Sequence, residues 1–234
     1  MCAKILALET TEKFGSAALL ECRKCGAAQS SDVLAEIVLP KDRRSSQTLH
    51  PAIYALFEST RTSPKEIAVV AVVAGPGSFT GLRVGVTAAK VVAYATGAKV
   101  IALDTFQTVA FGNTVTASLI SVGVDAQRGE VVAAVLRQAE DGHVEFIRKP
   151  ELMMVADWWK HAEQYNGVLF SGPALERWSA KAPSHIVLAP ESDWFPKASQ
   201  AGKLAARRFM SEHFDDVWTL LPIYSRLSAA EEKC

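Results

Sequence analysis

Two acidic residues at the ends of predicted strands are candidate metal ligands. Glu9 and Asp125 each end a short apolar run that predicts a strand, and each is followed by a polar turn and a glycine, Gly15 or Gly129. Two such carboxylates facing a cleft could hold Mg²⁺ bound to nucleotide phosphates. The same positions suit acids that cap the turn after each strand, and we favour that structural role.

The segment Gly75–Gly81, with the sequence GPGSFTG, is the second candidate. It follows an apolar run of strand length, 67–74, and Ser78 or Thr80 can cap the helix that comes next. A P-loop would need a lysine after the last glycine, and a dinucleotide fingerprint would need a glycine where Thr80 stands. Backbone N–H groups at this helix N-terminus could still bind an anion, but a tight strand-to-helix turn explains the sequence better.

Other catalytic arrangements are missing from the sequence. Cys22 and Cys25 form a lone CxxC where a hairpin turn is expected, and no second ligand pair for zinc accompanies it. Ser78 does not lie in a GxSxG elbow. No two histidines are three or four residues apart, so no helical metal pair exists; they are His50, His143, His161, His185 and His213. We therefore predict no metal site and no cofactor, in an enzyme-like scaffold with a reduced active site.

The composition limits the function further. The 234 residues include 25 Lys+Arg and 25 Asp+Glu, so the total charge gives no electrostatic footprint for nucleic acid. One small basic cluster, 41–44, is interpreted as a solvated loop. No leader sequence is visible and no apolar run is long enough to cross a bilayer, so we expect a cytoplasmic protein with no membrane association.

The predicted elements occur in two similar series. The first is strand, strand, strand, helix, strand, helix, strand; its ranges are 4–9, 15–20, 33–39, 45–57, 67–74, a helix ending near 96, and 99–103. The motif of strand, acid, turn, glycine and strand recurs over 118–136. We therefore predict an α/β protein with two duplicated subdomains, 1–104 and 105–234, whose tail from about 220 returns to the first.

The predicted helix after Gly75–Gly81 carries small residues at every fourth position. These are Gly81, Gly85, Ala89, Ala93 and Gly97. Such a ridge allows another helix to approach closely, and the remaining surface of this helix is mostly apolar as well. The sequence therefore predicts cover on two sides, one from the protein's own sheet and one from another helix of this chain or of a partner.

Four segments resemble the TsaB family of bacterial threonylcarbamoyladenosine biosynthesis proteins. They are GPGSFTGLRVGVTAAK (75–90), ILALETT (5–11), VDAQRGEVVAA (124–134) and LLPIYSR (220–226). The resemblance covers nearly the whole chain. It implies the actin-like ATPase (ASKHA) fold, with two subdomains that each contain a mixed sheet flanked by helices.

The resemblance also implies a non-catalytic scaffold subunit that activates a catalytic paralogue, TsaD, on tRNA, with an ATPase, TsaE, joining the pair. The family interface is a helical bundle, which implies partner contacts at Leu49, Ile53, Phe57, Phe79, Gly81, Leu82, Gly85, Val86, Ala89 and Ala93. Vestigial nucleotide loops would correspond to Glu9, Thr10, Thr11, Gly75, Gly77, Ser78 and Asp125.

Two positions depart from the family pattern. Glu9 stands where an aspartate is usual, which weakens a nucleotide role, and Ser45-Ser46 replaces a frequent His-Ser pair. The main alternative is a free-standing ATP-dependent small-molecule kinase of the same fold, which ATP turnover by the chain alone would support. A metallopeptidase is a further alternative, against which the missing histidine pair argues. A homodimer through the same helices is expected to be possible when the partner is absent.

Overall fold

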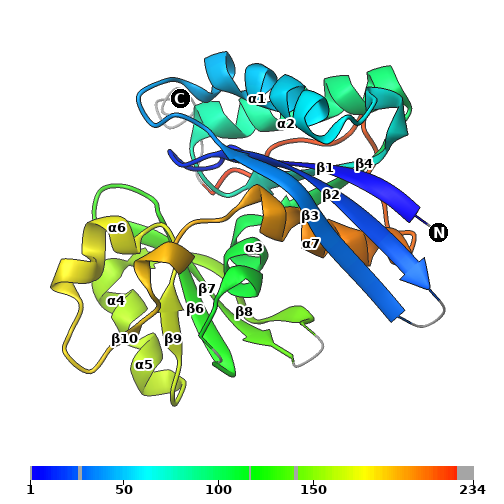
Figure 1. Ribbon diagram of the computed structural model, residues 1–234. Helices are drawn as coiled ribbons and strands as arrows, with labels where there is room; N and C mark the ends of the chain where they lie inside the picture. Colours follow the sequence, from blue (N-terminus) through cyan, green and yellow to red (C-terminus); the bar gives the residue numbers. More distant parts are fainter. Residues whose placement is uncertain (1, 26–27, 116, 140–141, 226–234) are drawn as a thin grey trace. The chain divides into compact units, whose positions relative to one another are not determined.

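The computed structural model divides into two units and describes residues 2–25, 28–115, 117–139 and 142–225 (Figure 1). Unit 1 contains Met1–Thr105 and Lys197–Ile223, whereas unit 2 contains Phe106–Pro196 and the chain from Tyr224 onward. The chain therefore returns to unit 1 at Lys197, earlier than the return predicted near residue 220.

Unit 1 is built on a mixed sheet whose order is β3-β2-β1-β4-β5. Its strands are β1 (Cys2–Glu9), β2 (Ser16–Cys25), β3 (Ala28–Val38), β4 (Ile67–Gly75) and β5 (Lys99–Asp104). β1 pairs antiparallel with β2 and parallel with β4. β4 is buried along nearly its whole length, as its unbroken apolar sequence predicted for a central strand.

Unit 2 repeats this arrangement. Its sheet has the order β10-β9-β6-β7-β8, formed by β6 (Leu119–Asp125), β7 (Glu130–Gln138), β8 (Val144–Met154), β9 (Leu169–Ser171) and β10 (Val187–Leu188). β6 pairs antiparallel with β7 and parallel with β9, as β1 does with β2 and β4. The predicted α/β duplication is therefore present in the pairing of the two sheets.

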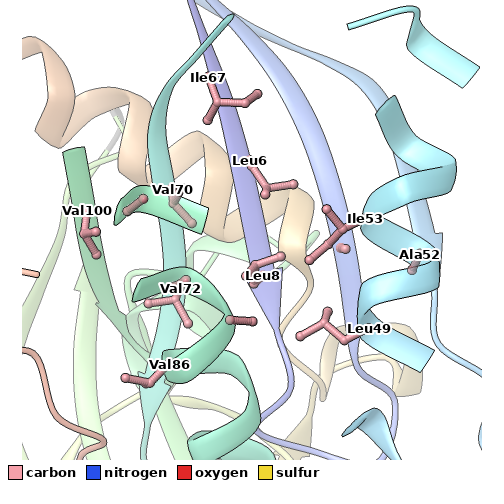
Figure 2. Packing of buried hydrophobic residues seen from close by; sticks show 14 of the residues in the cluster. Leu6, Leu8, Leu49, Ala52, Ile53, Ile67, Val70, Val72, Val86 and Val100 are labelled. Carbon is pink, nitrogen blue, oxygen red and sulfur yellow. The ribbon is translucent and has the colours of Figure 1, made fainter. Parts of the chain in front are cut away.

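Two helices cover one face of the unit 1 sheet. α1 (Ser45–Thr60) packs on β2 and β3, and α2 (Phe79–Thr96) packs mainly on β4. The core between them and the sheet contains apolar side chains from alternate strand positions, such as Leu6, Leu8 and Val72, together with Leu49 and Val86 of the helices (Figure 2). Pro51 lies within α1 on its exposed side.

The opposite face of this sheet is covered by α7 (Ala198–Met210), which packs on β1, β2, β4 and β5 (Figure 1). Gly202 brings the helix close to β2, because a Cβ there would lie 2.2 Å from Leu20 Cδ1. The first N–H groups of α7 are bound by the sheet. Ala198 N donates to Ser16 Oγ (2.8 Å), and Ser199 N donates to Glu36 Oε1 (3.0 Å).

The core of unit 2 contains a buried polar contact between its sheet and its helices. α4 (Val155–Trp159) and α5 (His161–Gln164) follow β8, and α3 (Thr105–Gly112) and α6 (Leu175–Trp178) complete the α-helices of the described part. Trp158 Nε1 donates to Ser121 Oγ, which lies 2.9 Å from His161 Nδ1. Trp158 lies against Gly123, where a Cβ would be 2.5 Å from its ring.

Several boundaries differ from those predicted. β2 continues to Cys25 and β3 begins at Ala28, whereas the sequence predicted an end at residue 20 and a start at residue 33. Cys22 lies within β2 with its side chain buried in the core, and Cys25 ends the same strand. The CxxC therefore belongs to a strand and not to the predicted turn.

Candidate functional site

Glu9 ends β1 with its carboxyl group fully buried. Its Oε1 accepts hydrogen bonds from the backbone N–H (2.5 Å) and the hydroxyl (2.6 Å) of Thr11, whereas Oε2 has no partner among the described residues. Burial removes the carboxyl from water and raises its pKa to about 8, although the Thr11 bonds act in the opposite direction. The two bonds from Thr11 to Oε1 are those of an acid that caps the turn after its strand, so the arrangement favours the turn-capping interpretation.

The N-terminus of α2 is occupied by the protein's own backbone. Ser78 N donates to the carbonyl oxygen of Thr11 (2.6 Å), and Gly81 N donates to Ser78 Oγ (3.4 Å). A Cβ on Gly77 would lie 2.5 Å from Thr11 O, and one on Gly81 would lie 1.9 Å from Thr10 O. The carbonyl oxygen of Thr11 therefore occupies a donor at the start of this helix, which disfavours a phosphate there.

Ile223, at the end of the segment that returns to unit 1, packs against Gly75, the first glycine of this turn. Gly75 has φ +131°, and a Cβ on it would lie 2.3 Å from the carbonyl oxygen of Ile223. Ile223 N donates to Ala74 O (2.7 Å), and the Thr105 hydroxyl donates to Pro76 O (2.7 Å). Gly75, Gly77 and Gly81 each have a packing reason within unit 1.

Asp125 has a local structural role in unit 2. Its Oδ1 accepts a hydrogen bond from Gln127 N (3.1 Å), and its Oδ2 lies 3.3 Å from Arg177 Nη1. Gln127, Arg128 and Gly129 all have positive φ values, so the carboxylate stabilises the start of a left-handed turn between β6 and β7. These contacts fit an acid that caps the turn after its strand.

The small-residue ridge of α2, which the family resemblance assigned to a partner, packs against its own unit in this structure. Gly81, Gly85, Ala89 and Ala93 are buried within unit 1. A Cβ on Gly85 would lie 2.3 Å from Thr10 Oγ1, and that hydroxyl donates to Gly81 O (2.8 Å). The glycines therefore make room for the Thr10 turn.

The other predicted partner contacts divide between core and surface. Leu49, Ile53, Leu82 and Val86 are buried in unit 1, Phe57 is half-buried, and Phe79 is exposed. The helices expected at an interface are thus present, but most of the side chains chosen from the sequence belong to the core of the protein itself.

A different set of apolar side chains is exposed on these helices and on the segment Asp215–Ile223, which we call the strap. Tyr54 of α1, Val91 and Tyr94 of α2, and Trp218 and Leu221 of the strap have exposed fractions from 56% to 72%. We call these five residues the outer surface. Exposed apolar side chains on neighbouring elements are typical of protein interaction sites.

Lys90 joins the strap to α2. Its ammonium group donates to the carbonyl oxygens of Trp218 and Leu220, both at 3.2 Å. The Tyr94 and Trp218 rings meet edge to face, with centroids 5.6 Å apart. Leu220 packs into the core beneath α2, so the neighbouring Trp218 and Leu221 point outward. This surface was not among the predictions, and its only local signal in the sequence is the run of apolar residues in 217–221 (VWTLL).

Neither a metal cluster nor a membrane-crossing helix is found in the described part of the chain. No group of three or more His, Cys, Asp or Glu side chains there is placed to hold a metal ion. None of the described helices is both long and apolar enough to span a bilayer.

Comparison with known proteins identifies the family. The sequence model described as "TsaD: tRNA N6-adenosine threonylcarbamoyltransferase" matches residues 32–188, about two thirds of the chain. The chain belongs to this family. Among curated proteins it is 29% identical to the tRNA threonylcarbamoyladenosine biosynthesis protein TsaB of Bacillus subtilis, over 98% of this chain and 96% of the relative. It is 26% identical to TsaB of Escherichia coli, over 82% and 84%.

Solved structures with the same fold are known. A protein from Pseudomonas aeruginosa described as similar to peptidase YeaZ superposes with a TM-score of 0.76 at 22% identity, over 96% of this chain and all of the other. YeaZ from the same organism gives 0.72 at 20% identity, over 95% and 99%. These likenesses confirm the fold. The curated relatives, by contrast, carry the TsaB assignment, and they do not favour the kinase alternative.

Proposed function

We propose that this chain is a non-catalytic subunit in tRNA threonylcarbamoyladenosine synthesis that binds and activates a TsaD-type transferase. The observation that carries the proposal is the outer surface, where five large apolar side chains of α1, α2 and the strap are exposed. The candidate catalytic loops, in contrast, use their polar groups in bonds within their own units. Exposed apolar side chains on α1, α2 and the strap therefore support protein binding at the outer surface rather than chemistry at the loops.

The family relationship supports the choice of partner. The matching sequence model is that of the transferase itself, so the proposed partner shares this fold and would have counterparts of α1 and α2. Two such helix pairs can pack as a pseudo-symmetric bundle, in which apolar outer faces cover each other. The same surface would allow a homodimer of this chain when the transferase is absent. A TsaE-type ATPase would then bind the assembled pair, and tRNA would be reached through the complex.

The interface is tested by placing a charge on it. Val91→Asp puts a carboxylate in the proposed contact, and burying it should raise the dissociation constant of the pair by about 30-fold or more, the equivalent of roughly 2 kcal/mol. Val187→Asp is the matched control, because Val187 of unit 2 is the same residue type with 59% exposure against 56% for Val91. Titration calorimetry of the purified pair measures both. Unchanged pairing for both variants would refute this interface.

The non-catalytic role is tested by reconstitution. Purified chain, TsaD-type paralogue and TsaE-type ATPase should modify tRNA together, and omission of the chain should abolish modification. The Val91→Asp variant should restore activity only at high concentration. Modification of tRNA, or ATP turnover with a small-molecule substrate, by the chain alone would contradict the proposal.

A further inference from the structure

Two loops of unit 1 place two lysines against one phenylalanine. Lys13 Nζ lies 5.1 Å and Lys41 Nζ lies 4.1 Å from the centroid of the Phe14 ring. Lys13 and Phe14 belong to the turn between β1 and β2, whereas Lys41 belongs to the loop between β3 and α1. The loops are joined by a hydrogen bond from Leu39 N to Gly15 O (2.7 Å). The lysines are therefore held together by the fold although they are far apart in the sequence.

The surroundings add positive charge. Arg43 and Arg44 are exposed and immediately precede α1, whose first turn contains no acidic residue. We call Lys13, Phe14, Lys41, Arg43 and Arg44 the basic edge. Residues 10–15 and 39–44 together contain four basic and two acidic side chains, the acids being Glu12 and Asp42. Because the whole chain is neutral, this excess is local.

A third cation–aromatic pair lies at the same edge of the sheet. β1, β3 and β4 run in the same direction, so the loops that follow them emerge together. The loop after β4 leads into α2, where the Arg83 guanidinium lies 4.0 Å from the centre of the Phe79 ring. Phe79 is exposed. Basic groups alternating with aromatic rings provide both charge for a phosphate backbone and planar surfaces for bases.

We propose that the basic edge binds the backbone of the tRNA substrate, an inference that rests on the proposed function. The ammonium and guanidinium groups would neutralise RNA phosphates and release their counterions. An acidic protein surface would also be attracted to these cations, but the chain belongs to a family that acts on tRNA, and this favours RNA as the partner. The sequence alone had indicated only a solvated loop, because the contact of Phe14 with both lysines depends on the fold.

The test compares two triple variants of the full chain, each paired with the TsaD-type paralogue. Lys41→Glu/Arg43→Glu/Arg44→Glu reverses the basic edge. Arg61→Glu/Lys65→Glu/Lys203→Glu is the control, because it makes the same change in net charge at exposed positions elsewhere in unit 1. Fluorescence anisotropy with a labelled, unmodified tRNA transcript gives the dissociation constant at 50–200 mM salt, conditions that we choose because backbone contacts are sensitive to salt over about this range. Gel filtration verifies that each pair remains assembled.

For the first triple variant we expect at least a tenfold loss of tRNA affinity and a decrease of about 2 in the slope of log K against log[salt]. The control should change affinity less than about twofold, since it leaves the proposed phosphate contacts in place. Equal losses in both variants, or no loss in either, would overturn the proposal. Weaker binding of the paralogue or of the ATPase with unchanged tRNA affinity would assign the edge to a protein and would overturn it too.

Two further measurements cover the cases in which the glutamate variant, or the wild-type chain, does not pair with the paralogue. If the glutamate variant does not assemble, the corresponding glutamine triple variant is measured, and wild-type tRNA affinity in that variant overturns the proposal. If the wild-type chain forms no pair at all, the proposed function fails, and tRNA binding is then measured on the chain alone. The same difference between the two triple variants is expected there.

Discussion

Gly85→Ala tests whether the ridge of α2 serves the protein's own sheet. The added Cβ would lie 2.3 Å from Thr10 Oγ1 but 3.6 Å from Thr10 Cβ and from Val72 Cγ2. Only the hydroxyl is therefore in the way. It must move, and the hydrogen bond from Thr10 to Gly81 O is lost with it.

The expected cost follows from three terms. Overpacking costs about 1–3 kcal/mol, and the lost hydrogen bond about 1 kcal/mol, whereas alanine in place of glycine within a helix contributes about 1 kcal/mol of stability. Gly85→Ala should therefore destabilise unit 1 by about 2 kcal/mol. Thr10→Ala alone should cost about 1 kcal/mol. In the double variant the methyl group meets only ordinary contacts, so its stability should be close to that of the wild type.

Urea unfolding combined with hydrogen exchange of α2 amides measures these differences, and the coupling energy between the two sites should be roughly 3 kcal/mol. At 234 residues, each 1 kcal/mol corresponds to about 2–4 °C in melting temperature. Additive losses in the double variant, or a stabilised Gly85→Ala protein, would refute the packing argument. Folded Gly85→Ala protein that no longer binds its partner would instead restore the ridge as an interface.

Three further predictions concern titration and the strap. The pKa of Glu9 is raised to about 8 in the folded protein, so the unfolded chain releases this proton at lower pH. The free energy of unfolding should therefore fall as pH rises from about 4.5 to 8. Glu9→Gln should flatten this part of a pH series of urea melts. Burial lowers the pKa of His161 to about 4, so stability should fall as pH decreases from about 6.5 toward 4, and NMR should find a neutral imidazole at pH 5.5; a charged ring there would contradict the burial argument. Lys90→Met keeps the aliphatic stem but removes the bonds to Trp218 and Leu220, so the strap should be cleaved faster by proteases while α2 keeps its hydrogen-exchange protection; equal cleavage rates would show that these bonds do not hold the strap.

The elements and their order could be predicted because their signals are local. The unbroken apolar run of β4 and the capped start of α2 need only neighbouring residues to be recognised, and the repeat of strand, acid, turn and glycine was sufficient to predict the duplication. The resemblance to TsaB rested on the same segments and was confirmed by the comparisons.

The orientation of the ridge could not be predicted, since spacing gives the face that small residues share but not the neighbour of that face. The neighbour is Thr10, which precedes Gly81 by 71 residues. The packing of α7 on the unit 1 sheet could not be predicted for the same reason. Its first two N–H groups are bound by Ser16 and Glu36, which lie more than 160 residues earlier. The outer surface depends on the strap reaching α2, which is again a contact distant in sequence.

The position of α7 has a consequence for synthesis of the chain. The face of the unit 1 sheet that carries Ile5, Ala7 and Leu20 is covered only by residues that leave the ribosome near the end of translation. Until then the nascent sheet exposes apolar surface to solvent, which makes it a substrate for chaperones. A stop codon just before Lys197 would consequently impair the unit that was synthesised first, although unit 2 would retain all its residues up to Pro196.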